Sequence, residues 1–506
     1  MKREHYAVNV DLEKFKELSK EGNVIPVGTE LVLDVETPVS VFKKLKDRGY
    51  GYLLESAEVH DQVGRYSFVG CDPEVVIRTR EDRVEIERNG EVEVRKQDRD
   101  PLEELKRVMS GYRAVGDFGE QAFRGGAVGY LGYDAVRFFE TRVPVVEEDP
   151  LGVPDAVFVL ARILVIFDHR YRKMRILSLA YLDDKKSPEE VYEDAILRLE
   201  EVLQELETPD GMVRISTGLE AEECEIRSNT TEEEYKQMVL KGQEYIRAGD
   251  IFQFVPSQRF EATYSGDEVS LYRALRFVNP SPYMFCLNFG GAFSLVGSSP
   301  EVHVRMQNEK IEIRPIAGTR LRGKNEEEDE ANAKDLLADP KERAEHIMLV
   351  DLARNDVGRI AKYGSVKVTD LMIIERYSHV MHIVSNVEGH LSGDNDCYDV
   401  LRATFPAGTV SGSPKVRAME IIAEVEKNKR GTYAGAVAYV GFDGNLDSCI
   451  VLRTVLMKDG KAYVQAGAGI VADSTPDGEY QETVNKARGM MKAIGLARRI
   501  ARLQEG

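Results

Sequence analysis

Four glutamates occur as two pairs of equal spacing, each near the start of a predicted helix. Glu342 and Glu345 belong to KERAEHIMLVDL, and Glu479 and Glu482 belong to DGEYQETVNKARGMM. Residues three apart on a helix lie on one face, so each helix would present two neighbouring carboxylates. Carboxylates are also favoured in the first turn of an ordinary solvated helix. The two pairs therefore leave two alternatives: solvated helix ends, or a shared site for Mg²⁺, which prefers oxygen ligands and an anionic substrate group.

Three glycine-rich segments could supply the rest of an anion-binding pocket. Each follows or separates predicted strands, and they are PIAGTRLRG (315–323), FPAGTVSGSPK (405–415) and QAGAGIVADS (465–474). Small residues allow backbone N–H groups to approach an anion closely, although the same composition is typical of tight turns. None of the three has the residue order of a nucleotide-binding loop.

Three basic residues, Arg453, Lys415 and His382, could complete a pocket for carboxylates. Each of them alone is better explained as part of a structural salt bridge or as a satisfied core residue. The residues by themselves thus indicate a Mg²⁺-dependent site for a small polyanion and leave the reaction open.

The elements that would position these residues mix strands and helices without a regular order. LARILVIFDH and KMRILSLAYL predict two strands joined by a polar turn. Ser187 and Pro188 predict the start of one helix, and a second helix, opening at TTEEEYK, is predicted to end at Gly249. Because strands and helices do not alternate as regular βαβ units, we expect an α+β fold.

A polar stretch rich in Gly, Thr and acidic residues separates two halves of the chain. We interpret residues 211–230 as a linker between an N-terminal domain, 1–210, and a catalytic domain, 231–500.

The composition excludes several classes of protein. The chain has 506 residues, 42% of them hydrophobic, and a net charge of −19, which argues against a nucleic-acid or anionic-membrane partner. Five cysteines lack C-x-x-C spacing, so neither a disulfide framework nor a zinc site is indicated. The first residues have no apolar core of a signal peptide, and no apolar run approaches a membrane span. We therefore expect a soluble cytoplasmic protein.

Long motifs in fixed order make the chain resemble the chorismate-utilising enzymes. They include GSSPE, KERAEHIMLVDLARNDVGR, HVMHIVSNVEG, FPAGTVSGSPK, RGTYAGAVAY and AGAGIVADSTPDGEYQET. LLES (53–56) and FRGGAVGYLGYD (123–134) further resemble the large subunits of anthranilate synthase. This resemblance implies a large antiparallel β-sandwich core flanked by helices, with an N-terminal half in the same assembly. It also implies conversion of chorismate and ammonia into anthranilate and pyruvate, the first committed step to tryptophan.

The resemblance assigns roles to individual residues. Glu345 and Glu482 match direct Mg²⁺ ligands, and Glu342 and Glu479 match residues that hold metal-bound water. Glu301 matches the general acid that helps the C4 hydroxyl to leave, which requires a raised pKa. The remaining positions match substrate-binding and further active-site residues: Gly318, Thr319, His382, Thr409, Lys415, Tyr433, Arg453, Gly467 and Gly469.

Two positions discriminate among relatives. Gln253 stands where water-adding members of the family carry a lysine base, and it favours ammonia as the nucleophile. Ala317 stands where aminodeoxychorismate synthases carry a nucleophilic lysine. An aminodeoxychorismate synthase component and a non-catalytic amino-acid sensor remain the alternatives. A phosphoryl-transfer enzyme would need a phosphate-binding loop that the sequence lacks.

The resemblance also implies partners and a regulator. None of the cysteines stands in the sequence setting of a glutaminase nucleophile, so a separate glutamine amidotransferase subunit would supply ammonia within a heterodimer or heterotetramer. Tryptophan would inhibit from a second pocket, which the resemblance assigns to Glu55, Ser56, Pro282, Tyr283, Met284 and Cys449.

Overall fold

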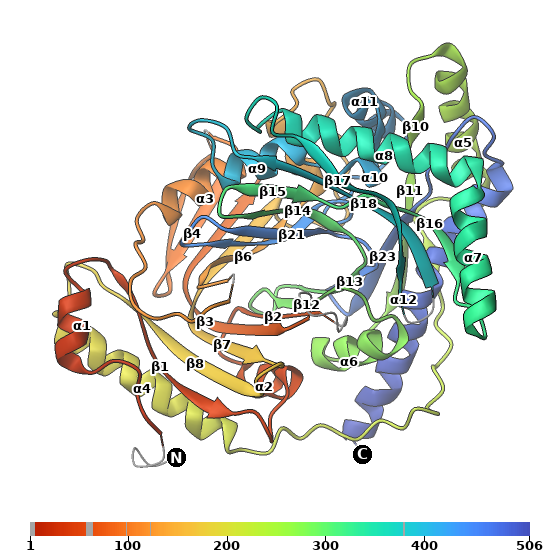
Figure 1. The fold of residues 1–506 in the computed structure, drawn as a ribbon. Coiled ribbons are helices and arrows are strands. Elements are labelled where there is room, and N and C mark those ends of the chain that lie inside the picture. Colours follow the sequence, from red (N-terminus) through yellow and green to blue (C-terminus); the bar gives the residue numbers. More distant parts are fainter. Residues whose placement is uncertain (1–5, 57–63, 98, 122, 378–379, 506) are drawn as a thin grey trace.

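The computed structural model describes residues 6–56, 64–97, 99–121, 123–377 and 380–505 (Figure 1). No helix within these ranges is long and apolar enough to cross a membrane. The elements of the N-terminal half are α1 (Leu12–Leu18), β1 (Val24–Val32), α2 (Pro38–Leu45), β2 (Gly51–Glu55), β3 (Tyr66–Arg80), β4 (Arg83–Arg88), β5 (Glu91–Lys96), α3 (Pro101–Met109), β6 (Gly126–Leu131), the short 3₁₀ helix η2 (Tyr133–Phe138), β7 (Ala156–Asp168), β8 (Lys173–Tyr181) and α4 (Pro188–Leu206).

The C-terminal half continues from residue 227. Its elements are β9 (Arg227–Ser228), α5 (Glu232–Ala248), β10 (Gln253–Phe254), β11 (Ser257–Thr263), α6 (Glu268–Val278), β12 (Tyr283–Asn288), β13 (Ser294–Ser299), β14 (Val302–Gln307), β15 (Lys310–Ile313), β16 (Ile316–Leu321), α7 (Glu326–Ala338), α8 (Pro340–Gly358), β17 (Lys367–Arg376), β18 (Val380–His390), α9 (Cys397–Thr404), α10 (Gly408–Ser411), β19 (Gly412–Ser413), α11 (Lys415–Val425), β20 (Ala436–Gly441), β21 (Leu446–Ile450), β22 (Thr454–Lys458), β23 (Lys461–Gly467) and α12 (Pro476–Glu505).

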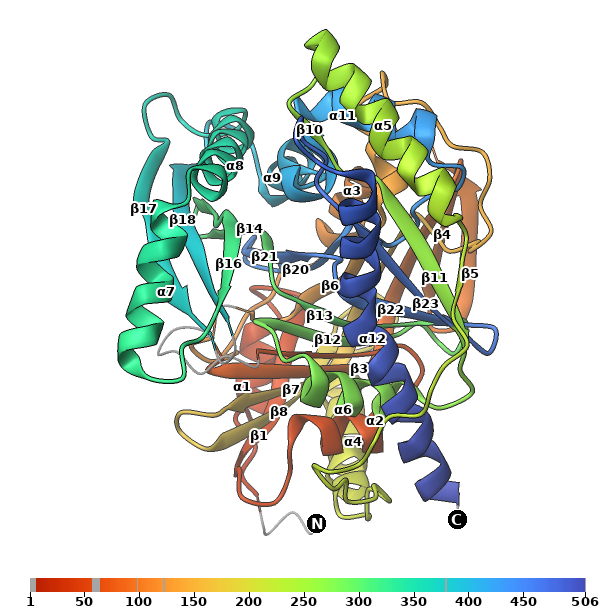
Figure 2. The same ribbon diagram turned by 90° about the vertical axis from the view of Figure 1, so that its right-hand side faces the viewer.

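A large antiparallel sheet forms the centre of the molecule. Hydrogen bonds join 21 strands of the described ranges into one network, and the strand pairings within it are antiparallel. Helices flank this sheet, with α7 and α8 beside β16–β18 and α12 and α5 beside β11 and β23 (Figure 2). The predicted α+β class, with an antiparallel β core flanked by helices, is confirmed.

Strands from the two halves of the chain pair directly with each other. β2 pairs with β12, so that Glu55 lies opposite Met284, and β6 pairs with β20, so that Gly129 lies opposite Ala438. The N-terminal half therefore belongs to the same assembly as the C-terminal half, as expected. Residues 208–226 contain neither helix nor strand. The division of the chain into two domains at 211–230 stays a prediction.

Capping residues in the sequence correctly predicted the start of α4 and the end of α5. Helix α4 begins with a capping box in which the Ser187 hydroxyl accepts from the Glu190 backbone and the Glu190 carboxylate accepts from the Ser187 backbone. Helix α5 ends at Gly249, whose φ of 84° is the left-handed conformation that favours glycine. Strands β7 and β8 form the predicted antiparallel pair. These predictions are confirmed because caps and turns depend on few, nearby residues.

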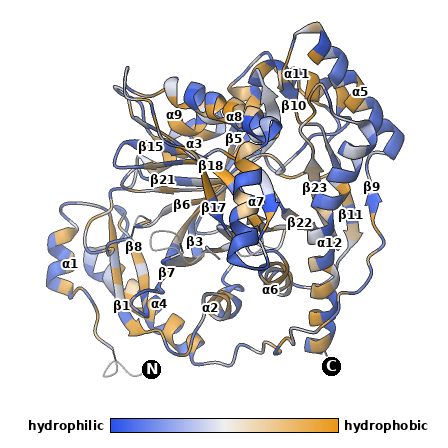
Figure 3. Cartoon of the chain, turned by 45° about the vertical axis from the view of Figure 1, so that its right-hand side comes forward, coloured by the Kyte–Doolittle hydropathy of each residue, from blue (hydrophilic) through white to orange (hydrophobic). Residues whose placement is uncertain are grey.

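The two helices that carry the glutamate pairs are fixed by apolar faces. In α12, Met490, Ile494 and Ala497 are buried at helical spacing and pack into the same core as α6. In α8, Leu349 and Ala353 are buried in the same way. Figure 3 shows hydrophobic and hydrophilic residues intermixed along outer helices such as α4 and α12, as expected of helices with one buried face. Each glutamate pair is thus carried on a helix that the core holds in place.

Candidate active site

One cavity lies between the α8 side and the α12 side of the molecule. Its volume is about 330 Å³, enough for a small organic molecule. Its lining residues include Ala317 of β16 and Glu345 of α8, and Gly467 of β23 and Glu482 of α12. In Figure 2, β16 and α8 lie to the left of β23 and α12. The sequence-predicted residues that line this cavity are Gln253, Glu301, Glu345, Thr409, Tyr433, Arg453, Gly467, Gly469, Glu479 and Glu482.

Three of the four predicted glutamates, Glu345, Glu479 and Glu482, line this cavity, and Glu342 does not. Burial raises the pKa of Glu345, and the nearby charges of Glu342 and Glu482 raise it further. Burial likewise raises the pKa of Glu479, with Glu482 contributing in the same direction. Glu342 lies one turn before Glu345 and forms an ion pair with Arg320 at 3.2 Å. The carboxylates are therefore close enough to repel one another, which solvated helix ends would avoid.

The glutamate cluster has the chemistry that Mg²⁺ requires. Across the residues that the structure describes, no three acidic, histidine or cysteine side chains converge closely enough to bind an ion by themselves. Mg²⁺ is usually held by only one or two carboxylates, with waters and substrate oxygens completing its octahedron. A cation here would also relieve the repulsion that raises the pKa of Glu345. Glu345 and Glu482 thus fit such an ion as partial ligands.

Lys486 occupies the same acidic region. Its ammonium lies 2.6 Å from a carboxylate oxygen of Glu482 and donates to the Gly467 carbonyl at 3.0 Å. Lys341 also lines the cavity. Sequence reasoning gave neither lysine a role, although the i, i+4 spacing of Glu482 and Lys486 on α12 was a readable signal.

Glu301 sits in the cavity wall between β13 and β14. Its carbonyl accepts from the Ile450 backbone N–H at 3.0 Å, which anchors the residue to the end of β21. Burial raises the pKa of the Glu301 carboxyl, and smaller effects of Thr409, Arg453 and Lys486 oppose this shift. The buried Thr409 hydroxyl, which acts on the Glu301 carboxyl, has no hydrogen bond of good geometry to any described residue. A raised pKa is the property that a general acid needs.

Tyr433 and Arg453 provide a phenol and a guanidinium in the same cavity. Tyr433 is 6% exposed, and burial raises the pKa of its hydroxyl. A Cβ on Gly467 would lie 2.7 Å from this hydroxyl oxygen, so glycine is required for their close approach. Arg453 has a left-handed backbone with φ of 46°, a conformation that is unusual for a non-glycine residue and is concentrated at functional sites. The guanidinium can bind a carboxylate through two parallel hydrogen bonds.

Most of the segment 315–323 forms strand β16 (Ile316–Leu321) and is neither the tight turn nor the loop that its composition indicated. Gly318, at φ of 69°, interrupts the pairing of β16 with β18 between Ala317 and Thr319. The Gly318 carbonyl accepts from Nδ1 of His382 at 2.8 Å, and the Thr319 hydroxyl lies 3.1 Å from the same nitrogen. Because a carbonyl only accepts, Nδ1 carries the proton and Nε2 is left as an acceptor. These three residues adjoin the cavity wall at Ala317.

Burial also sets the charge of His382. It lowers the pKa of the imidazole, while the Gly318 carbonyl has a smaller opposing effect. His382 is therefore neutral at neutral pH, and Nε2 is the ring nitrogen that can take a proton.

Lys415 does not line this cavity. Its ammonium donates to both carboxylate oxygens of Asp356 at 2.8 Å and to the Thr404 carbonyl at 2.9 Å. This buried ion pair ties the start of α11 to α8 and to the end of α9. The structure thus shows Lys415 in the kind of structural salt bridge that the residue alone indicated. Its partner, Asp356, could not be named from sequence because it lies on another helix.

The six residues assigned to a tryptophan pocket gather around the β2–β12 pairing. Glu55 is buried opposite Met284, accepts from the Tyr272 hydroxyl at 2.5 Å and lies 3.4 Å from Arg276. Tyr283 donates to Asp447 at 2.9 Å and is close to Cys449. Ser56 directly follows β2, and the next residues, 57–63, lie outside the described ranges. Pro282 directly precedes β12.

Known proteins are similar to this chain in sequence over almost its whole length. The model of the chorismate binding enzyme family matches residues 52–492. Anthranilate synthase component 1 of Aquifex aeolicus is 48% identical over 493 residues, which covers 97% of this chain and 98% of that protein. Anthranilate synthase component 1 of Acetivibrio thermocellus is 46% identical over 489 residues, which covers 96% and 98%.

Solved structures show the same architecture. Anthranilate synthase component I from Streptococcus pneumoniae has a TM-score of 0.75 and 37% identity, covering 91% of this chain and 99% of that one. The menaquinone-specific isochorismate synthase from Escherichia coli has a TM-score of 0.70 but 18% identity, covering 95% and 98%, and is similar in fold alone. On this sequence identity, and with this cavity, the chain belongs to the chorismate-binding enzymes and, within them, to the anthranilate synthase component 1 proteins.

Proposed function

We propose that this chain converts chorismate and ammonia into anthranilate and pyruvate, with Mg²⁺ as cofactor. The observation that carries the proposal is the content of one 330 Å³ cavity. It brings together a carboxylic acid of raised pKa, an arginine suited to a carboxylate, and three glutamates suited to a cation. Gln253 and Ala317 occupy the positions at which a lysine would favour water addition or covalent attack.

The first step is a substitution in which this chain supplies the acid. The nitrogen of ammonia forms a bond to C2 of chorismate, the two ring double bonds shift, and the C4–O bond breaks. Glu301 gives its proton to the departing hydroxyl, which leaves as water, and its carboxylate can then take the surplus proton from the new ammonium group. Tyr433 and Arg453 hold the enolpyruvyl carboxylate in place during this step.

The second step is an elimination that needs a base. A proton leaves C2, the C3–O bond breaks, and the released enolpyruvate gains a proton on its methylene carbon to become pyruvate, while the ring becomes aromatic. We assign the base to His382, because Nε2 is the ring nitrogen that remains able to accept a proton. Mg²⁺, when bound, would neutralise the ring carboxylate of the substrate. Glu345 and Glu482 would hold it directly, with Glu342 and Glu479 as outer partners.

Ammonia would come from a separate glutaminase subunit. A glutaminase nucleophile must be an accessible thiolate. All five cysteines of this chain are free thiols, and burial raises the pKa of each of them: Cys71, Cys224, Cys286, Cys397 and Cys449. This supports a heteromeric complex in which the partner hydrolyses glutamine.

The direct test mixes the purified chain with chorismate, Mg²⁺ and an ammonium salt at mildly alkaline pH, without a partner. We expect anthranilate and pyruvate in equal amounts, lost on addition of a chelator and restored by excess Mg²⁺. Chromatography identifies the aromatic product. Aminodeoxychorismate or isochorismate as the product would contradict the assignments of Ala317 and Gln253.

We further propose that tryptophan inhibits the enzyme by binding where β2 meets β12. The support is that the structure gathers Glu55, Tyr283 and Met284 there, away from the substrate cavity. Ser56→Ala is expected to raise the tryptophan concentration for half inhibition by about tenfold, a typical loss for a hydrogen bond to a charged group. Uninhibited activity should stay near that of the wild type. Inhibition curves of the two proteins check this, and identical curves would remove Ser56 from the tryptophan site.

A further inference from the structure

A second, smaller cavity lies directly behind the wall of the substrate cavity. Its volume is about 20 Å³, which is room for one water-sized molecule but not for chorismate. Tyr433 and Gln465 line both cavities, so they form the partition between the two spaces. The other lining residues of this rear cavity are Leu151, Arg259, Arg430, Thr432, Val451, Thr454, Leu456 and Tyr463.

Hydrogen bonds fix the orientation of the Gln465 amide. The Ser257 hydroxyl and backbone N–H both donate to the Glu426 carboxylate, at 2.9 Å and 2.7 Å. Because its one proton is used in this way, the Ser257 hydroxyl can only accept from the Gln465 amide nitrogen, which lies 2.8 Å away. The Gln465 amide oxygen therefore faces away from Ser257.

This amide oxygen is buried and has no hydrogen-bond donor among the described residues. A buried carbonyl without a partner costs about 1–3 kcal/mol, and such an atom in a native protein calls for an explanation. The amide oxygen of Gln253, a residue that is 4% exposed and lines the substrate cavity, is unpartnered in the same way. Two acceptors without donors thus occur in the walls of one cavity, and a small molecule rich in N–H groups would satisfy them.

The charged residues that line the rear cavity favour an uncharged molecule over a cation. Arg259 and Arg430 line it, and Arg430 is 2% exposed, anchored by Glu426 at 2.6 Å. Its described lining residues include no carboxylate, so an ammonium ion would have no anionic partner there, whereas uncharged ammonia needs none. Arg259 donates to the Lys429 carbonyl at 3.4 Å, which links the rear cavity to the ion pairs that Lys429 forms.

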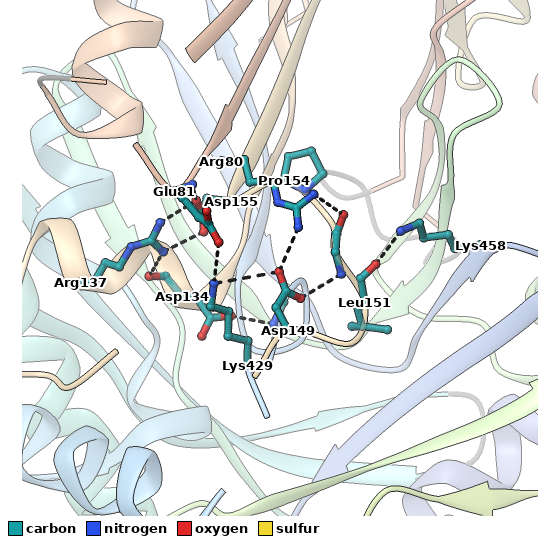
Figure 4. Close-up of polar contacts among 12 residues, drawn as sticks. Arg80, Glu81, Asp134, Arg137, Asp149, Leu151, Pro154, Asp155, Lys429 and Lys458 are labelled. Carbon is teal, nitrogen blue, oxygen red and sulfur yellow. Dashed lines mark hydrogen bonds and ion pairs between the residues drawn. The ribbon is translucent and has the colours of Figure 1, made fainter. Parts of the chain in front are cut away.

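The outer side of the rear cavity lies at a seam between the two halves of the chain. Lys429 pairs with Glu81 at 3.6 Å and with Asp149 at 4.0 Å, and Lys458 donates to the Leu151 carbonyl at 2.6 Å (Figure 4). Leu151 itself lines the rear cavity. Charged side chains from the two halves of the chain therefore meet near Leu151, which lines the rear cavity but not the substrate cavity.

We propose that uncharged ammonia reaches the substrate through this rear cavity, and that the Gln465 amide oxygen accepts a hydrogen bond from it there. Gln465 holds the nucleophile at the partition, and Gln253 accepts from it on the substrate side. The proposal rests on the proposed function, since it names how that reaction receives its second substrate. It makes Gln465 a nucleophile-binding residue with no role in binding chorismate.

The test is steady-state anthranilate formation with Mg²⁺, in which ammonium chloride is varied at saturating chorismate and constant ionic strength. Gln465→Met keeps the side-chain volume but removes the acceptor. We expect the KM for ammonia to rise about three- to tenfold, the range of one lost hydrogen bond. The KM for chorismate should stay within about twofold of the wild type. Val451→Ile, which adds one methylene group to the wall of the rear cavity, should raise the KM for ammonia in the same selective way.

Gln258→Met is the matched control. Gln258 is also a buried glutamine, and it lies opposite Ala466 in the β11–β23 pairing, but its amide is fully engaged by Thr483 and Ser228 at 2.7 Å each. Its replacement should leave the KM for ammonia unchanged, and thermal unfolding of all variants checks their folding.

The possible results of these assays distinguish failure of the proposed function from failure of the rear-cavity proposal. A wild-type chain that makes no anthranilate from chorismate and ammonium would refute the proposed function itself. Wild-type activity combined with an unchanged KM for ammonia in Gln465→Met and Val451→Ile would overturn the rear-cavity proposal alone. So would an equal rise in the KM values for ammonia and chorismate, because that result would show a general distortion of the site. If Gln465→Met does not fold, the Val451→Ile result decides.

Discussion

Replacing Glu301 by glutamine is expected to lower kcat for anthranilate formation by about 10²–10⁴-fold, the usual contribution of a general acid. Glutamine has the same shape and is neutral, like the protonated acid, but it has no acidic proton to give to the departing hydroxyl. The KM for chorismate should change little, since Tyr433 and Arg453 are untouched. Steady-state kinetics with ammonium as the nitrogen source measures both values.

The pH profile gives this prediction a second readout. Burial raises the pKa of Glu301, so the protonated, active form persists to higher pH than for an ordinary glutamate. At saturating free ammonia, the wild-type rate should therefore fall as pH rises through that raised pKa, and the small remaining rate of Glu301→Gln should lack this descending limb. Glu312→Gln, on the neighbouring strand β15 and paired with Lys310, is a control that should keep the wild-type profile. A full rate in Glu301→Gln would assign the acid to another group.

Replacing Glu345 by alanine is expected to lower kcat/KM for chorismate by at least about 10²-fold. Loss of an outer-shell partner of a metal ligand typically costs 10–100-fold in affinity or activity, and a direct ligand should cost at least as much. The structural reason is that Glu345 of α8 and Glu482 of α12 line one cavity from two different helices. Without Glu345, only the glutamates of α12 would remain in the cavity to bind the cation.

Mg²⁺ binding can be measured without turnover. In the wild type, titration with Mg²⁺ in the presence of chorismate should raise the thermal unfolding temperature, because a ligand that binds the folded state stabilises it. Glu345→Ala should need a much higher Mg²⁺ concentration for the same rise. Glu233→Gln, an acid in the first turn of α5, should behave like the wild type. A Mg²⁺ response in Glu345→Ala equal to that of the wild type would refute the role of Glu345 as a ligand.

Two lysines with similar ion pairs, Lys415 and Lys486, lie in different places relative to the cavity. Lys415 and Lys486 both have an acidic partner, at 2.8 Å and 2.6 Å. Lys415 is held between helices behind Glu301, whereas Lys486 is exposed at the cavity and bound to Glu482, a predicted metal ligand. The resemblance assigned substrate binding to Lys415 and gave Lys486 no role, although Lys415 by itself was better explained as part of a structural salt bridge.

Much of this protein could be predicted from sequence where the deciding contacts are local. The capping box at Ser187 and the glycine stop at Gly249 define α4 and α5 through neighbours within a few residues. The spacing of Glu342 with Glu345, and of Glu479 with Glu482, placed each pair on one helical face, and the long motifs indicated the family. These signals need no knowledge of which segments meet in space.

Only the tertiary structure decided how those pieces combine. It brought the glutamates of α8 and α12 to one cavity, turned the segment around Gly318 into a bulged strand that holds His382, and directed Lys415 to Asp356. It also isolated the amide oxygen of Gln465 at the partition between two cavities. Each of these results depends on atoms from segments far apart in the chain, whose approach is set by core packing and strand pairing and therefore leaves no local pattern in the sequence.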